Sequence, residues 1–358
     1  MTFGTRFIAA CGTVALLAAC APDQNGNQGA TGSAAGTTDG VALTGAGATF
    51  PYPIYGKWFN DYAAKTGIKI NYQSIGSGGG VRQIIEQTVD FGASDSPMTD
   101  EELSRAKGGP ILHIPTVLGA DVITYNVPGV PHGLKFSGQV VADIFLGKIT
   151  KWNDPRIATL NAGITLPNAD ILVVHRSDGS GTTYIFTDYL SAVSPEWARV
   201  VGKGKEVNWP TGIGARGNEG VAGQVKQTPG SIGYVELAYA KQNNLAYASI
   251  QNAAGNFVAP TIESISAAAT AIPATSDYRV SVVNATGANA YPISSFTWLL
   301  VYRGPADTAK SRILTDFLRY ALTEGAAAAR ALDYAPLPEG MTRQLLTRID
   351  SIGAGTGR

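Results

Sequence analysis

Histidine and cysteine are scarce in this chain of 358 residues, which holds three histidines and two cysteines. The histidines, His113, His132 and His175, lack the spacing of metal ligands, so we expect no metal site and no cofactor. A Gly-x-Ser-x-Gly nucleophile elbow and a phosphate-loop lysine motif are also missing. An enzyme needs an activated nucleophile or a metal cluster. We therefore do not expect an enzyme, and a secreted phosphohydrolase is kept only as the alternative from this class of protein.

No charge of one sign is in excess, since 27 lysines and arginines face 27 aspartates and glutamates. Loss of Arg6 with the leader described below would leave 26 basic residues against 27 acidic ones. This balance argues against a nucleic-acid binder, which carries a basic excess or stripe. An anion would be bound by local geometry rather than by long-range attraction. No repeat of fixed period is visible, so a solenoid or propeller is not expected.

The apolar run at the N-terminus, Phe7–Ala19, is too short to cross a bilayer as a helix, which takes roughly 20 apolar residues. With Arg6 before it and small residues at its end, it has the form of a secretory signal peptide. Its end, Leu17-Ala-Ala-Cys20, resembles the lipobox of bacterial lipoproteins. In that family the leader is cut before the cysteine and the thiol is diacylated. The resemblance implies a signal peptide over 1–19 and lipidation at Cys20; an ordinary signal peptide containing a cysteine is the alternative.

Cleavage at this point would leave Cys20 as the one cysteine, at the extreme N-terminus, where an anchor accounts for it. Residues 21–40 are rich in Gly, Ala, Thr, Asn and Gln and have almost no large apolar side chain. Such a segment cannot offset its ordering entropy by burial, so we predict a flexible tether over 20–40. The remaining residues, 41–358, are long enough for two domains.

Strand and helix patterns alternate along these residues and predict an α/β protein. Strand-like runs are expected at Ile68–Ile75, Ile171–His175, Ser231–Val235 and Phe296–Tyr302. Helical spacing of apolar residues is visible from Ile54 to Tyr62 and from Ile313 to Leu322. These stripes indicate core faces and need no ligand to explain them.

Three turns rich in Gly, Ser and Thr stand directly before helical patterns: residues 45–51, 76–80 and 176–183. In the first, Thr49 is predicted to cap the following helix. A helix N-terminus offers unpaired N–H groups and a positive dipole end, so each turn can receive an anion. One turn alone has a purely structural explanation, namely capping. Three in one chain, one of them with Arg176 and Asp178, favour an anion pocket.

A carboxylate, Asp95, stands in a fourth small-residue segment, Asp90–Pro97. It could simply cap a helix starting near Pro97. A carboxylate repels an anion unless the anion carries a proton that it can donate. Phosphate near neutral pH carries one and sulfate does not, so Asp95 argues against a binder of sulfate or molybdate.

These segments resemble the phosphate-binding protein family of the phosphate-specific ABC transporter. The similarity runs over essentially the whole mature chain and is carried by several motifs: Thr44–Pro51, Asp90–Asp95, Leu146–Ile149 with Trp152, Asp178–Thr182, Gly233–Glu236 and Tyr239–Asn244. Together these motifs are far more specific than a shared fold. An adhesin or a purely structural lipoprotein would need none of them.

The resemblance implies named roles at a phosphate site. Hydroxyl or backbone donors are implied at Thr49, Phe50, Ser77, Ser180, Gly181 and Thr182. Asp95 would accept the phosphate's proton, Arg176 would donate forked hydrogen bonds to phosphate oxygens, and Asp178 would hold that arginine in place.

The fold implied by the resemblance is the two-lobe, class II periplasmic-binding-protein architecture, in which a mixed sheet flanked by helices forms each lobe. We expect lobe 1 at 41–120 and 292–358 and lobe 2 at 121–291, with crossings near Leu118–Asn126 and Tyr291–Tyr302. The anion would bridge the lobes and favour a closed state. The expected partners of this monomer are inorganic phosphate, the permease subunits of the importer and, through the lipid, the cell membrane. It would lie outside the cytoplasm, which is the periplasm in a Gram-negative cell.

Overall fold

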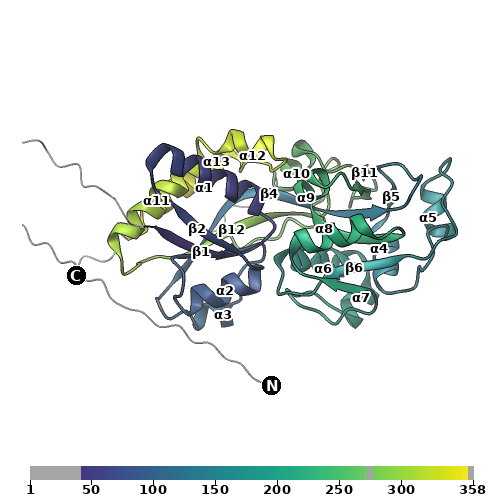
Figure 1. The fold of residues 1–358 in the computed structure, drawn as a ribbon, viewed down its shortest axis with the longest axis horizontal. Coiled ribbons are helices and arrows are strands. Elements are labelled where there is room, and N and C mark those ends of the chain that lie inside the picture. The colour runs from purple at the N-terminus through teal and green to yellow at the C-terminus, as the bar shows by residue number, and fades with distance from the viewer. Residues whose placement is uncertain (1–41, 271, 273–276, 354–358) are drawn as a thin grey trace, which may run out of the picture. The chain divides into compact units, whose positions relative to one another are not determined.

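One long strand, β4 (Ile111–Asn126), organises this computed structural model, which describes residues 42–270, 272 and 277–353. They belong to one compact unit, residues 39–358. The first part of β4, up to Ala120, pairs with β12 (Ser294–Tyr302), and its last part, from Asp121, pairs with β8 (Ser231–Glu236). The sheet therefore continues through β4, in the order β2-β1-β3-β12-β4-β8-β6-β7 (Figure 1).

The elements on the β12 side of this change of partner form the β1 half of the molecule. Its strands are the first part of β4, β12, β1 (Leu43–Gly47), β2 (Ile70–Ser74) and β3 (Phe91–Ser94). Its helices are α1 (Tyr52–Thr66), α2 (Ser77–Ile85), α3 (Asp100–Ser104), α11 (Thr308–Leu322), α12 (Ala326–Ala331) and α13 (Glu339–Ile349). The strands β1, β2 and β3 are parallel, whereas β12 runs antiparallel to β3 and β4. Figure 1 shows α1 and α11 on one face of this sheet and α2 and α3 on the other.

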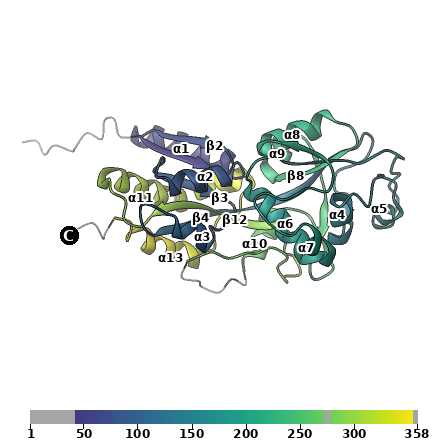
Figure 2. The same ribbon diagram turned by 90° about the horizontal axis from the view of Figure 1, so that it is seen from below.

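The elements on the β8 side of this change of partner form the β8 half. Its strands are the last part of β4, β8, β6 (Leu172–Arg176), β7 (Ile213–Ala215) and β9 (Ala246–Tyr247). A small separate sheet is formed by β5 (Lys135–Phe136), β10 (Ser249–Gln251) and β11 (Phe257–Val258). The helices of the β8 half are α4 (Gly138–Phe145), α5 (Pro155–Leu160), α6 (Gly181–Val193), α7 (Pro195–Val200), α8 (Gly217–Gln227), α9 (Leu237–Gln242) and α10 (Ile262–Ala268). Figure 2 shows α8 and α9 on one side of β8 and α6 and α7 on the other.

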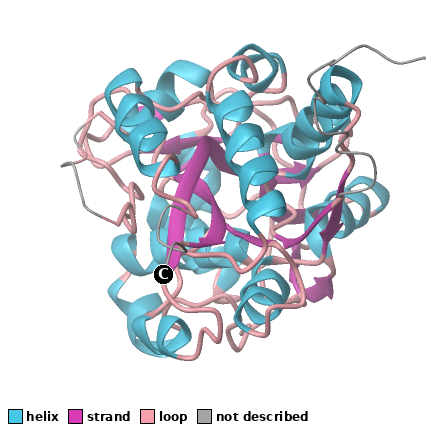
Figure 3. Ribbon diagram, turned by 90° about the vertical axis from the view of Figure 1, so that its left-hand side faces the viewer, coloured by secondary structure: helices cyan, strands magenta, loops and turns pink. Residues whose placement is uncertain are grey.

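The predicted mixed α/β architecture is observed, with helices packed around the strands (Figure 3). The four expected strands are β2, β6, β8 and β12, with ends shifted by no more than two residues. The apolar stripe of α1 is buried, from Ile54 to Tyr62, as its helical period requires. The same holds for α11, where Ile313, Phe317 and Leu318 lie in the core.

Two expected helix starts are displaced. The helix expected near Pro97 begins at Asp100, because Thr99 forms a capping box with Glu102. The helix expected near Thr183 already begins at Gly181.

No helix within the described ranges is long and apolar enough to span a bilayer. The predicted signal peptide, Cys20 and the tether lie outside the residues that the structure describes.

Candidate functional site

Every predicted site residue lies where a strand ends or a helix begins. Thr49 and Phe50 connect β1 to α1, Ser77 is the first residue of α2, Asp95 follows β3, Arg176 ends β6, Asp178 lies in the next loop, and Ser180, Gly181 and Thr182 start α6. The first four residues come from the β1 half and the others from the β8 half. Because parallel strands of one sheet end at the same edge, this placement gathers the side chains at two facing edges.

The starts of α2 and α6 have the form expected of anion-binding turns. The residue before α2 is Gly76, which adopts φ 88°, and a Cβ there would lie 2.4 Å from Oδ2 of Asp178. Ser180 caps α6, since its Oγ accepts a hydrogen bond from the backbone N–H of Thr183 at 3.0 Å. That hydroxyl still has its own proton to donate. Both helix ends therefore offer donors and positive dipole ends to the same region.

Arg176 and Asp178 form a buried ion pair. The guanidinium donates through Nε to Oδ1 at 2.7 Å and through Nη2 to Oδ2 at 2.6 Å. The side chains are 1 % and 12 % exposed. Although burial alone would raise the pKa of Asp178, hydrogen bonds from Arg176 lower it, so the carboxylate stays charged. The forked geometry holds the guanidinium in one orientation, and Nη1 points instead to Oγ1 of Thr182 at 3.3 Å.

Thr49 does not cap α1, so that prediction is wrong. The N-cap of α1 is Pro51, which has no side-chain cap bond. The hydroxyl of Thr49 instead accepts two hydrogen bonds from Asn218, one from its backbone N–H at 3.2 Å and one from Nδ2 at 2.7 Å. Two donors at the start of α8 compete successfully with the helix for this oxygen.

Asn218 is a residue of the site that the sequence analysis missed. It is fully buried, and its Nδ2 also donates to Oγ1 of Thr182 at 3.0 Å. The preceding Gly217 adopts φ 72° and its N–H donates to Asp178 at 3.0 Å. The signal that could have found it is the segment Arg216–Gly220, another Gly-containing stretch at the start of a helix.

Asp95 is buried, with 1 % of its surface exposed, and does not cap a helix. Its Oδ1 accepts a hydrogen bond from the hydroxyl of Thr297 at 2.8 Å, and its Oδ2 accepts one from Ser77 at 3.3 Å. Burial raises the pKa of Asp95 to about 7, against the opposing effects of Thr297, the charge of Arg176 and Ser77. Thr297 was also missed, because it comes from β12 and no local pattern marks it.

The two halves meet at this cluster. A Cβ on Gly181 would lie 2.4 Å from Oγ of Ser77 and 2.6 Å from Oδ2 of Asp95. Beside it, the backbone N–H of Gly78 donates to the carbonyl of Gly179 at 2.8 Å. Glycine is required where the backbones approach so closely. The structure thus brings the β1-half residues against those of the β8 half.

Phe50 lies at the back of the cluster. Its ring is fully buried and packs edge-on against Tyr334, with centroids 6.5 Å apart. Its carbonyl accepts a hydrogen bond from the hydroxyl of Tyr334 at 2.7 Å. A Cβ on Gly119 would lie 2.4 Å from the ring, so this glycine of β4 makes room for Phe50. These contacts hold the connection between β1 and α1 against the long strand.

The described part of the chain has no metal-type cluster, and two of its histidines make structural contacts. No group of three or more His, Cys, Asp or Glu side chains there could hold a metal ion. His113 is buried and accepts a hydrogen bond from the N–H of Met98 at 3.0 Å, and burial lowers its pKa to about 4. His175 stacks on Trp209 with ring centroids 4.7 Å apart. Both histidines therefore have structural contacts.

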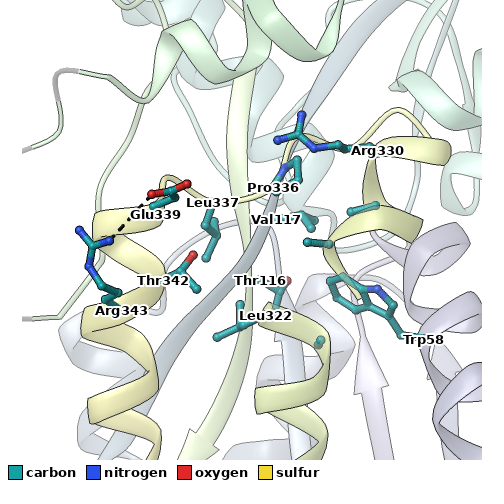
Figure 4. A pocket seen from close by; sticks show the side chains of 13 residues that line it. Trp58, Thr116, Val117, Leu322, Arg330, Pro336, Leu337, Glu339, Thr342 and Arg343 are labelled. Atoms are coloured by element: carbon teal, nitrogen blue, oxygen red, sulfur yellow. Dashed lines mark ion pairs between the residues drawn. The ribbon is translucent and has the colours of Figure 1, made fainter. Parts of the chain in front are cut away.

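A separate pocket of about 330 Å³ lies in the β1 half (Figure 4). Trp58 and Leu322 line it on one side, and Arg330 and the ion-paired Glu339 and Arg343 also line it. None of the predicted site residues lines it, so it does not belong to the cluster described above.

Comparison with known proteins gives consistent matches. Residues 28–324 match the family model of the PBP superfamily domain. The chain is 51 % identical over 312 residues to the phosphate-binding protein PstS of Pasteurella multocida, covering 86 % of this chain and 90 % of that protein. It is 50 % identical over 300 residues to the phosphate-binding protein PstS of Haemophilus influenzae, covering 83 % and 89 %.

A solved structure has the same fold. It is a high-affinity periplasmic phosphate-binding protein, PfluDING, bound with phosphate, and it matches with a TM-score of 0.70 at 23 % identity, covering 86 % of this chain and 93 % of that one. This likeness confirms the two-lobe fold predicted from the sequence.

Proposed function

Because the chain belongs to the PstS family of phosphate-binding proteins in the PBP superfamily, we propose that it binds inorganic phosphate with high affinity outside the cytoplasm. It delivers the bound anion to the permease subunits of an ABC importer. It is a substrate-binding protein and not an enzyme, because that is the role of the family.

The observation that carries this proposal is a buried acceptor, Asp95, among converging donors. Several N–H and O–H groups and the guanidinium of Arg176 reach the same cluster. Phosphate near neutral pH has bare oxygens to accept from these donors and a proton to donate to the carboxylate. Sulfate has only acceptor oxygens and would face Asp95 without a partner. A buried polar group left unmatched discriminates strongly between such ligands.

The site residues have these roles in the proposal. Arg176 donates charge-assisted hydrogen bonds to phosphate oxygens, and Asp178 keeps its guanidinium in place. Asp95 accepts the phosphate's proton. The other donors are the hydroxyls of Thr49, Ser180 and Thr182 and the backbone N–H groups of Phe50, Ser77 and Gly181. The hydroxyl of Ser77 donates to phosphate in place of its hydrogen bond to Asp95. The positions of α2 and α6 support these roles, since their N-termini face the cluster.

We further propose that the two halves are the lobes, with boundaries at 41–120 and 292–358 for lobe 1 and 121–291 for lobe 2. The change of partner on β4 supports this division, because Ala120 pairs with Ser294 whereas Asp121 pairs with Glu236. Phosphate held by residues of both lobes then stabilises the closed state.

The same proposal includes a monomer anchored to the cell membrane through a lipid on Cys20, with residues 20–40 as tether. The lipobox-like Leu17–Cys20 supports the anchor. Membrane fractionation of Cys20→Ser tests it, since a variant that stays in the membrane fraction would contradict lipidation at this thiol.

Calorimetric titration with phosphate and with sulfate tests the binding function, on the wild type and on Asp95→Asn. The wild type is expected to bind phosphate and to bind sulfate far more weakly. Asp95→Asn should lose about tenfold or more of its phosphate affinity, because the amide cannot serve as the charged acceptor of the phosphate's proton.

A matched control is Asp170→Asn, which neutralises a carboxylate that is 82 % exposed and paired with Lys151. It should leave both affinities unchanged. Equal wild-type affinity for the two anions would contradict the role of Asp95. Absence of phosphate binding by the wild type would contradict the function itself.

A further inference from the structure

Asn218 links the two halves through a single side chain. Its Nδ2 donates to the hydroxyl of Thr49 in the β1 half and to the hydroxyl of Thr182 in the β8 half, at 2.7 and 3.0 Å. Its Oδ1 accepts the backbone N–H of Glu236 at 2.9 Å. A backbone N–H can only donate, so the amide oxygen must face Glu236. The amide nitrogen must therefore face the two threonines.

This orientation determines what the two hydroxyls can do. The oxygen of Thr49 accepts from the backbone N–H and from Nδ2 of Asn218. The oxygen of Thr182 accepts from Nδ2 of Asn218 and from Nη1 of Arg176. A hydroxyl has two lone pairs and one proton, so both oxygens have their acceptor capacity filled. Each can act further only as a donor.

Neither proton has a partner elsewhere in the described part of the chain, since neither hydroxyl donates a hydrogen bond there. Both threonine side chains are buried, with 2 % and 0 % of their surfaces exposed. A buried donor without an acceptor is costly, so these protons indicate an acceptor that a ligand supplies.

We propose that Asn218 is a positioning residue that directs the hydroxyl protons of Thr49 and Thr182 toward the bound phosphate. This inference rests on the proposed function and deepens it. With both hydroxyls restricted to donation, the phosphate oxygens facing them must be unprotonated. The phosphate's proton is then directed to Asp95, because both oxygens of the other site carboxylate, Asp178, accept from Arg176. Asn218 thereby selects the orientation in which a protonated tetrahedral oxyanion binds.

A double-mutant cycle tests this role. Asn218→Leu is compared in the wild-type chain and in a chain with Thr49→Val and Thr182→Val, by ³¹P NMR titration with inorganic phosphate, which also measures weak binding. In the wild-type chain the substitution should lower the affinity by about 10- to 100-fold, because each hydroxyl keeps only one of its two donors and its hydrogen bond to a charged ligand is less well oriented. In the double-valine chain it should change the affinity by about twofold or less, since no hydroxyl remains to be oriented.

Asn161→Leu is the matched control. Asn161 is also a buried asparagine, with Oδ1 accepting the N–H of Lys135 at 2.8 Å and Nδ2 donating to the carbonyls of Lys135 and Ile157. Its loss should lower the melting temperature without changing phosphate affinity. Asn218→Ser, run in parallel, gives the same comparison with a smaller side chain if the leucine variant does not fold.

Two results would overturn the inference. One is an equal loss of affinity from the Asn218 substitution in both chains, which would assign the residue a general structural role. The other is undiminished affinity in the otherwise wild-type chain. Failure of the wild type to bind phosphate is a separate result, and it concerns the proposed function.

Discussion

Asp95 is a buried carboxyl whose protonation state, in the proposed site, decides which anion is bound. Burial raises its pKa to about 7. The ionised form therefore prevails above this pH and accepts a proton from a ligand, whereas the protonated form prevails below it and donates one. We expect the affinity for sulfate to rise about tenfold from pH 8 to pH 5, because binding at pH 8 must first protonate the carboxyl. Calorimetric titration with sulfate at both pH values measures this.

In Asp95→Asn the amide can donate at either pH, so the sulfate affinity should be independent of pH over this range. A wild-type sulfate affinity that is equally flat would contradict the role assigned to the protonated carboxyl.

The residues of the site differ in how well the sequence alone identifies them. The pair Arg176 and Asp178 could be predicted, since both lie in one Gly-rich turn and meet within it. Thr297 could not, because it donates to Asp95 across 202 positions of the chain. Asn218 has only a weak local signal, and its importance arises from contacts in both halves.

Two carboxyls face each other where the sheet changes partner on β4. Asp121 and Glu236 are opposite residues of β4 and β8, and both are fully buried. Oε2 of Glu236 accepts the N–H of Ala238 at 2.8 Å and lies 2.8 Å from the hydroxyl of Tyr334, whereas neither oxygen of Asp121 has a hydrogen-bond partner among the described residues. Burial raises the pKa of both carboxyls well above the ordinary value.

A carboxyl whose pKa is raised on folding stabilises the folded state fully at low pH, and this contribution is lost as the pH rises toward the folded pKa. The unfolding free energy of the wild type should therefore fall, relative to that of Asp121→Asn, by about 1.4 kcal/mol for each pH unit over which the folded carboxyl keeps a proton that the unfolded one has lost. Urea denaturation at pH 5 and pH 8 measures the difference.

Asp170→Asn, at an exposed position, should show no such trend. If the unfolding free energies of Asp121→Asn and the wild type differ by the same amount at pH 5 and pH 8, the pKa of Asp121 is not raised by folding, and the prediction is contradicted.

The four predicted strands and the stripes of α1 and α11 could be read from the sequence, because β2 alternates with a period of 2, β6, β8 and β12 are short apolar runs, and the helices have a period of 3.6. Their ends were less predictable. Thr49 has the residue type of an N-cap, yet its hydroxyl bonds to α8, since a tertiary donor is available there. The local preference of a threonine for capping its own helix is therefore overridden where a distant element offers a better hydrogen-bond partner.

Across the whole molecule, the two halves contact each other beside the proposed phosphate site. One such contact is the ion pair of Lys205 and Glu102, whose side chains are only 19 % and 16 % exposed. The segments near Leu118–Asn126 and Tyr291–Tyr302 were predictable as strand-like, but a contact between residues 103 positions apart has no local pattern. The carbonyl of Lys205 also accepts the N–H of Ser180 at 2.9 Å, so this loop supports the start of α6.

Because this ion pair joins the two halves, it can exist only while they are together, and its loss shifts the equilibrium toward opening. Lys205→Met should therefore speed the release of bound phosphate by about two- to tenfold, the range expected of a partly buried ion pair. Rapid filtration with radiolabelled phosphate measures the release rate.

Lys203→Met is the matched control, because Lys203 pairs with Asp188 at 2.9 Å within the β8 half and keeps that contact whether or not the halves separate. An equal acceleration in both variants would show that a general loss of charge, rather than the joining of the halves, governs release.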